Sequence, residues 1–119
     1  MLKINLSQVF LAASNIDSAL HYADEVKAHV TLTRDVQIVA DWNGLMAKIS
    51  LKKGKSGLAR DYAMKAINTL KNNLGYTHIL YDTYKTLIES YRLEAQYREA
   101  LETYTTYISL KDSLDRKRK

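Results

Sequence analysis

The chain has 119 residues, enough for one domain with a real hydrophobic core. It contains no cysteine, which excludes disulfides, thiolate zinc sites and cysteine nucleophiles, and no proline, which favours an all-α fold. Its apolar runs are far shorter than the roughly 20 residues of a membrane span, and the first residues do not resemble a signal peptide.

The net charge of +5 is concentrated at the C-terminus, because residues 115–119 carry one acid and four bases. Such a basic tail could attract nucleic-acid phosphates in a salt-dependent way. A tail can fray, however, and it does not form a patterned binding face. Nucleic-acid binding is therefore a minor alternative.

The first three predicted helices follow the spacing of apolar residues at a period of 3.6. The first covers Lys3 to Ala13, and the second runs without a break from Ile16 to Leu32 after a cap at Asn15. The third, Arg34 to Lys53, follows a cap at Thr33. Gly54 ends it in the way that glycine commonly ends helices.

Three further helices follow at the same period. The fourth runs from about Leu58 to Asn73, after a start at Ser56 or Gly57 and before a stop at Gly75. The fifth runs from His78 to Glu94, with Thr77 as its cap. The sixth begins near Gln96 or Tyr97 and continues to at least Leu114. About six antiparallel helices in three hairpins are expected.

The hairpins are expected to be copies of one repeat. Ala19, Ala59 and Ala100 begin similar patterns 40 and 41 residues apart, and each is preceded by a matching first helix. Small residues at this position let two helices approach closely. The repeats are placed at about 1–33, 34–75 and 76–114, followed by the tail at 115–119.

These patterns resemble the tetratricopeptide repeat (TPR) family, which has large residues on the first helix and alanine and aromatics on the second. The matching positions are Tyr84, Leu87, Tyr91, Ala100 and Tyr104 in the last copy, and Ala47, Gly54, Ala59 and Ala66 in the middle copy. The resemblance implies one right-handed α-solenoid. The period of about 41, against the usual 34, implies longer helices.

A narrower resemblance is carried by LKKG at 51–54, YREALETY at 97–104 and YISLKDSL at 107–114. These segments look like the TPR sensor modules of bacterial two-component histidine kinases and related regulators. The resemblance implies a soluble sensory segment of a longer signalling protein, in the cytoplasm or the periplasm. It does not assign the compartment, the flanking domains or the partner.

The resemblance also implies a concave face, formed by the first helix of each hairpin, that binds a protein or peptide. The predicted face comprises Gln8, Leu11, Asp41, Leu45, Lys48, Lys52, Asp82, Lys85, Glu89 and Arg92. The alternative is a solvated polar surface without a ligand. Gly44, on the same face, leaves space either for a ligand or for a neighbouring helix, of which packing is preferred, and Trp42, beside the core stripe, is attributed to packing against a neighbouring helix.

Aromatic residues could instead stack on single-stranded bases. The repeat register argues against this, because it assigns to the core Tyr84, Tyr91, Tyr97, Tyr104 and Tyr107. Tyr76 and Tyr81 are expected to be partly exposed.

No enzymatic site is predicted. His21, His29 and His78 lack the spacing of metal ligands, and Ser18 with His21 lacks a third group and an oxyanion hole. The glycines do not form a phosphate or dinucleotide motif. We therefore predict a non-enzymatic module without a metal or cofactor.

Self-association is the main alternative function, because a stack without a polar capping helix exposes apolar ends. The expected end surfaces are Leu2, Ile4, Val9 and Phe10 at one end, and Ile108 and Leu114 at the other.

Overall fold

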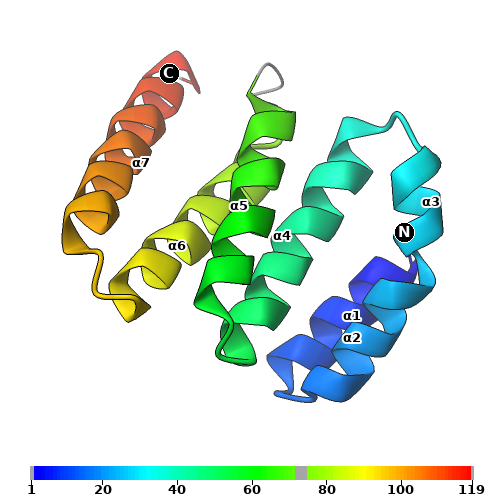
Figure 1. The fold of residues 1–119 in the computed structure, drawn as a ribbon. Helices are drawn as coiled ribbons and strands as arrows, with labels where there is room; N and C mark the ends of the chain where they lie inside the picture. Colours follow the sequence, from blue (N-terminus) through cyan, green and yellow to red (C-terminus); the bar gives the residue numbers. More distant parts are fainter. Residues whose placement is uncertain (1, 72–74, 119) are drawn as a thin grey trace.

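The computed structural model describes residues 2–71 and 75–118, and over these residues the secondary structure is helical, without a strand. The described part measures 37 × 33 × 24 Å (Figure 1). The helices are α1 (Leu2–Ala12), α2 (Ile16–Glu25), α3 (Lys27–Leu32), α4 (Val36–Lys52), α5 (Ser56–Leu70), α6 (Thr77–Leu93) and α7 (Tyr97–Arg118). The all-α prediction is confirmed.

Three tight turns join α1 to α2, α4 to α5 and α6 to α7. Each turn has one residue with positive φ: 62° at Ser14, 77° at Gly54 and 59° at Ala95. After α4, the Gly54 N–H donates to the Leu51 carbonyl and the next N–H donates to Ser50, which satisfies the last helical carbonyls. The same pair of bonds closes the other two turns, so the predicted end at Gly54 is confirmed.

The helix predicted from Ile16 to Leu32 is interrupted at Val26, which makes seven helices in the described residues where about six were expected. The Ala23 carbonyl accepts the Val26 N–H at 3.3 Å and the indole Nε1–H of Trp42 at 2.9 Å. A side chain inserted into the helical bond ladder kinks a helix. The tertiary contact with Trp42 therefore divides the helix into α2 and α3.

The helix starts were predicted with mixed success. Asn15 caps α2 as expected, accepting the Ser18 N–H. The predicted cap at Thr33 is wrong, because Asp35 caps α4. The Asp35 carboxylate accepts the backbone N–H groups of Gln37 and Ile38 in the first turn. Thr33 instead accepts the Asp35 N–H.

The two later starts and one end also differ from the prediction. Ser56 and Thr77 are the first residues of α5 and α6, whose N-cap positions are Lys55 and Tyr76. α5 ends at Leu70, before the predicted stop at Gly75. The end expected at Asn73 lies outside the described residues.

Small residues bring the paired helices together. Ala19 and Ala59, two of the three alanines that begin the predicted repeat pattern, are fully buried. Ser7 of α1 is buried against α2, where its hydroxyl donates to the Ala19 carbonyl. Trp42 lies in the same core and meets the ring of Tyr62 edge-on, which confirms its predicted packing role.

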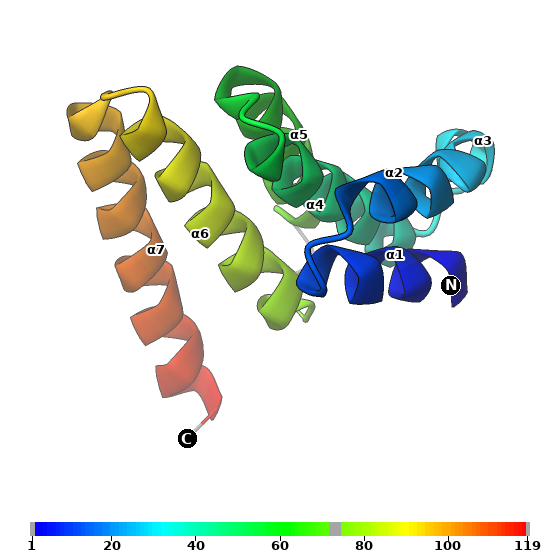
Figure 2. The same cartoon turned by 90° about the horizontal axis from the view of Figure 1, so that it is seen from below.

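The aromatic prediction fails for two of the three tyrosines that it assigned to the core on the last helix. Tyr107 is buried, and Tyr84 and Tyr91 are half-buried, but Tyr97 is 67% exposed and Tyr104 50% exposed. α7 lies at one edge of the molecule and, among the described elements, packs only against α6 (Figure 2). No further helix of the described chain covers its outer side.

The terminal segments agree with the expectation in part. Residues 115–118 continue α7 as helix, which is consistent with the prediction that the sixth helix runs to at least Leu114; Lys119 lies outside the described residues. Of the predicted apolar ends, Ile4 and Leu114 are buried, while Val9 is 64% exposed. The side chain of Leu2 lies outside the described part.

Candidate functional site

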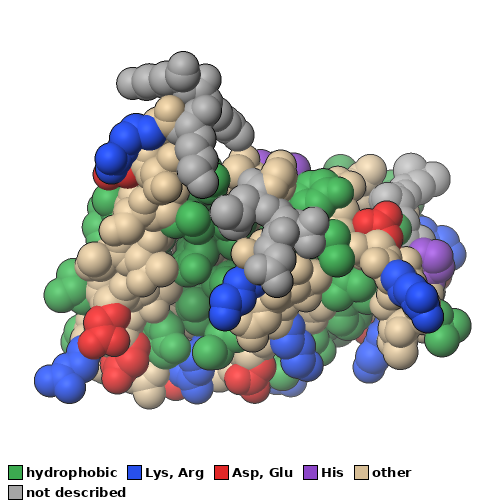
Figure 3. All heavy atoms as spheres, turned by 90° about the horizontal axis from the view of Figure 1, so that it is seen from above, with side chains coloured by type: hydrophobic (Ala, Val, Ile, Leu, Met, Phe, Trp, Pro, Cys, Tyr) green, Lys and Arg blue, Asp and Glu red, His purple; other side chains and the backbone are tan. Residues whose placement is uncertain are grey.

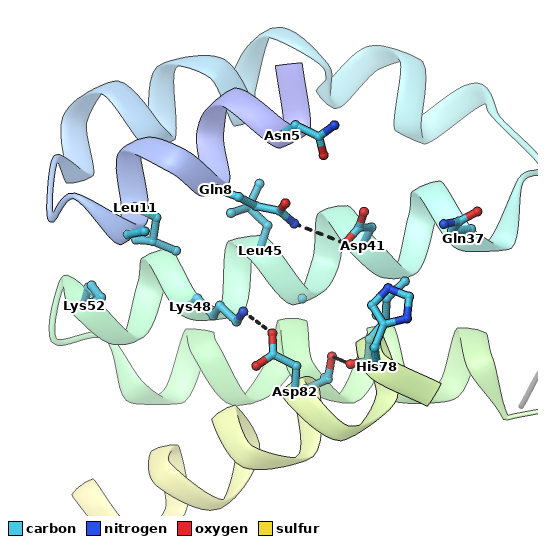
Figure 4. Close-up of a pocket in the computed structure, with 14 residues that line it drawn as sticks. Asn5, Gln8, Leu11, Gln37, Asp41, Leu45, Lys48, Lys52, His78 and Asp82 are labelled. Atoms are coloured by element: carbon cyan, nitrogen blue, oxygen red, sulfur yellow. Dashed lines mark hydrogen bonds and ion pairs between the residues drawn. The ribbon is translucent and has the colours of Figure 1, made fainter. Parts of the chain in front are cut away.

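A hollow of about 520 Å³ lies between α1, α4 and α6 (Figure 4). We call it the groove. Three consecutive helix pairs supply one helix each to its walls. Seven of the ten residues predicted for the concave face line it: Gln8, Leu11, Asp41, Leu45, Lys48, Lys52 and Asp82.

The floor of the groove is apolar. Leu11 of α1, Leu45 of α4 and Ile79 of α6 line it and are buried, so the core extends to the base of the hollow. Contact between a ligand and these side chains would remove apolar surface of both the ligand and the protein from water. The groove therefore combines an apolar base with polar walls.

Two polar contacts bridge the groove walls (Figure 4). The Gln8 side chain on α1 donates to the Asp41 carboxylate on α4, at 3.3 Å from Nε2 to Oδ1. Lys48 on α4 forms an ion pair with Asp82 on α6. Both side chains of that ion pair are partly exposed, so the pair adds little stability and a competing ligand group can replace either partner.

The carboxyl of Asp41 on the groove wall has a raised pKa. Burial raises the pKa of Asp41, because the ionised form loses hydration, while the charge of His78 and the hydrogen bond from Gln8 act in the opposite direction. A partly desolvated carboxylate with one long hydrogen bond retains acceptor capacity. Asp41 can therefore accept an N–H from a ligand.

Gly44 sets the separation between α4 and α6. A Cβ atom at this position would lie 3.2 Å from the Thr83 hydroxyl oxygen, which is tighter than ordinary contact. Thr83 is buried and donates to the Ile79 carbonyl, so its hydroxyl is held in place. The interpretation of Gly44 as a packing glycine is confirmed.

The sequence prediction missed one turn of the groove. Asn5, Gln37 and His78 also line it, and Gln37 and His78 lie four residues before the predicted Asp41 and Asp82. Four residues along a helix return to the same face. Extending the predicted stripe by one N-terminal turn on each helix would have found both.

Lys85, Glu89 and Arg92 do not line the groove. They follow Asp82 along α6, whose later turns lead away from α1 and α4 (Figure 2). Arg92 and Glu89 pair with each other on the exposed surface. The Arg92 guanidinium lowers the pKa of Glu89 through this hydrogen bond.

A second, shallower hollow of about 310 Å³ lies between α5 and α7 above α6. Its lining is largely apolar and includes Met64, Ile67, Tyr84, Leu87 and Tyr91. Figure 3 shows hydrophobic side chains in this hollow, between α7 and α5. Its polar lining consists of Asn68 on α5 and of Glu102, Thr103 and Thr106 on α7.

In the described residues, no group of three His, Cys, Asp or Glu side chains could hold a metal ion. His21 does have an acidic partner one turn away, because its Nε2 lies 2.9 Å from a carboxylate oxygen of Glu25. Lys3 also pairs with Glu25 and, with His21, lowers the pKa of that carboxyl.

None of the helices described is both long enough and apolar enough to cross a lipid bilayer. Comparison with protein-family models, curated proteins and solved structures gave no match. The function is therefore inferred from the residues that line the groove.

Proposed function

We propose that the chain is a tetratricopeptide-like interaction module that binds an extended segment of a partner protein in the groove. One observation carries the proposal. Residues predicted to share a concave face, drawn from three helices far apart in the sequence, surround one hollow of about 520 Å³. That volume is within the range of ligand-binding pockets, roughly 300 to 1,000 Å³.

The repeat assignment is supported by the turns. The positive-φ residues Ser14, Gly54 and Ala95 are 40 and 41 residues apart, the same separations as the alanines that begin each repeat pattern. Each turn uses the same two hydrogen bonds. Three turns that are closed by the same hydrogen bonds at equivalent positions favour three copies of one hairpin, stacked as a solenoid.

The lining chemistry favours a peptide. The side-chain amides of Asn5, Gln8 and Gln37 offer both donors and acceptors, as a peptide backbone requires. Lysines and aspartates are mixed, so no single sign of charge dominates, and charged groups of a peptide would find partners of either sign. The buried Leu11 and Leu45 at the base would contact an apolar side chain of the segment.

The test begins with peptides selected from a random library displayed against the wild-type protein. Their affinity is then measured by fluorescence titration for a groove variant, Lys48→Glu with Lys52→Glu. The matched control is Lys27→Glu with Lys71→Glu, two exposed lysines outside the groove with the same charge change.

The groove variant should bind at least about tenfold more weakly, which corresponds to 1.4 kcal/mol, while the control should stay within about twofold. Equal affinity of both variants for every selected peptide would contradict binding in the groove. Circular dichroism must show that both variants are folded at the assay temperature, because Lys48→Glu also places a second carboxylate beside Asp82.

On the resemblance to kinase sensor modules, we further propose that this binding serves a bacterial signalling protein. The relevant observation is the sequence that flanks this segment in its parent gene. A flanking region that encodes no signalling domain would contradict this context without affecting the groove.

A further inference from the structure

The hollow of about 310 Å³ between α5 and α7, which we call the second hollow, is open where the corresponding space one hairpin earlier is filled. In that earlier space, Tyr62 of α5 packs against the core cluster that includes Trp42 and Met46, and its ring meets the indole edge-on. The third hairpin follows the second at an offset of 41 residues, so Thr103 and Leu87 occupy the positions of Tyr62 and Met46. Thr103 and Leu87 both line the second hollow. A small side chain therefore stands where the preceding hairpin has an aromatic ring.

The walls of the second hollow offer an aromatic ligand both apolar and aromatic contacts (Figure 3). Leu87 is buried, and the tyrosines on either side of it along α6, Tyr84 and Tyr91, are half-buried. At the same offset, α4 has the polar residues Asn43 and Ser50 in place of these tyrosines. Aromatic rings attract one another in offset or edge-on arrangements, so these walls favour a ring over an alkyl chain.

The second hollow has one charged side chain among the described residues that line it. This residue, Glu102, is exposed, and its carboxylate forms no ion pair within the described part of the chain. The hydroxyls of Thr103 and Thr106 already donate to carbonyls of their own helix, at 2.7 and 3.1 Å. The Glu102 carboxylate and the side-chain amide of Asn68 can both accept an N–H from a ligand. The polar lining therefore favours a cation.

A basic group lies close to the second hollow but is already paired. The guanidinium of Arg60 lies over the ring of Tyr91, at 5.5 Å from its Cζ to the ring centroid, and its Nη1 is 3.1 Å from a carboxylate oxygen of Glu94. Arg60 does not line the hollow. Its charge is balanced by Glu94, so it does not cancel the charge of Glu102. Its position also shows that the ring of Tyr91 accommodates a cation.

We propose that the second hollow binds a small aromatic amine, with the ring between α5 and α7 and the ammonium group at Glu102. The ring takes the place that the Tyr62 side chain takes one hairpin earlier. The hollow lies at the lower end of the volume range of ligand pockets, roughly 300 to 1,000 Å³, so it suits a ligand with a single ring. The second hollow and the groove share no lining residue, so this inference does not depend on peptide binding.

The probe is phenethylamine, which carries a phenyl ring and an ammonium group on a short chain. It is titrated by NMR into the isotope-labelled protein up to about 10 mM, because a ligand of this size should have a dissociation constant of about 1 mM. The largest shifts should occur at the backbone amides of Leu87 and Thr103, with nuclear Overhauser contacts from the phenyl ring to the methyl groups of Ile67. The amides around Leu45 in the groove should not shift.

Two ligand controls each change one feature of the probe. Hydrocinnamate keeps the ring and the chain length but carries a carboxylate, and propylamine keeps the ammonium group without the ring. Each should bind at least about tenfold more weakly than phenethylamine, because the first loses the attraction of Glu102 and the second loses the buried ring.

Two variants test the residues. Glu102→Gln should weaken the binding of phenethylamine about three- to fivefold, as expected for the loss of an exposed ion pair. Its matched control, Glu99→Gln, makes the same charge change one turn earlier on α7, outside the lining, and should stay within about twofold. Thr103→Tyr gives the third hairpin the residue that the second has, so it should fill the hollow and weaken binding at least about tenfold.

The proposal is overturned if phenethylamine shifts none of these amides, or if either ligand control binds as tightly as phenethylamine. A Thr103→Tyr protein that is folded by circular dichroism and binds like the wild type overturns it as well. If Thr103→Tyr does not fold, Glu102→Gln decides, because this position is exposed and an unchanged affinity there would contradict the ion pair.

Discussion

Replacing Trp42 with phenylalanine tests how the first helix pair is attached to the second. The substitution removes the Nε1–H that donates to the Ala23 carbonyl at 2.9 Å. Losing this buried hydrogen bond should cost about 1 kcal/mol, and the smaller ring should cost about 1 kcal/mol more in lost packing. The free energy of unfolding should fall by about 2 kcal/mol, and the melting temperature by roughly 8 °C.

The same substitution should change the break between α2 and α3. Without the indole, the Ala23 carbonyl is free to accept the N–H of Lys27, which would continue α2 into α3. Urea unfolding followed by circular dichroism measures the stability, and hydrogen exchange measures the protection of the Lys27 amide. We expect lower stability together with slower exchange of that amide relative to its neighbours.

A control separates the hydrogen bond from the ring contact. Tyr62→Leu removes the edge-on contact between the two rings, at 5.9 Å between centroids, and leaves the indole N–H in place. It should lower stability by about 1 kcal/mol without changing the relative protection of Lys27. If Trp42→Phe cost less than about 0.5 kcal/mol and left Lys27 unchanged, the indole would not cause the break.

Five further substitutions test the packing, the turns and the groove. Ala59→Leu should lower the free energy of unfolding by about 1 to 3 kcal/mol in urea unfolding, while Ala100→Leu, half-buried at the equivalent position, should cost clearly less; equal costs would contradict the different burial of the two copies. Tyr81→Phe should keep or raise the melting temperature, because it removes a buried hydroxyl for which the described residues provide no hydrogen-bond partner. Ala95→Gly should stabilise the fold by about 1 kcal/mol in chemical unfolding, since φ is 59° there, and a loss would argue against the left-handed turn. Asp41→Asn should gain stability relative to the wild type as the pH rises, because the folded pKa of Asp41 is raised and the stability that this carboxyl contributes below its unfolded pKa of about 3.9 is lost as the pH rises through the folded pKa; a difference that stays constant with pH would refute the burial of this charge.

The sequence was sufficient for features that depend on local spacing. The helix pairs, the cap at Asn15, the end at Gly54 and the first-helix residues of the groove all follow from periodicity and from the chemistry of helix ends. These rules act within a few residues, so a single chain displays them completely.

Features that depend on a distant neighbour were not predictable in this way. The break at Val26 requires Trp42, which is sixteen residues further along and on another helix. Register assigned Tyr97 and Tyr104 to an inward face, but register cannot tell whether a neighbouring helix is present. Similarly, helical spacing gave the direction of Arg92 around α6 but not the path of that helix away from the groove.

The most direct test of the central claim is an NMR titration of the isotope-labelled protein with a library-selected peptide. If the segment binds in the groove, the largest shifts should occur at the side-chain amides of Gln8 and Gln37 and at the backbone amides around Leu45. The amides of Tyr97 and Leu101 on α7 should move least. Shifts concentrated on α7, with the groove amides unchanged, would contradict the assignment of the groove as the binding site.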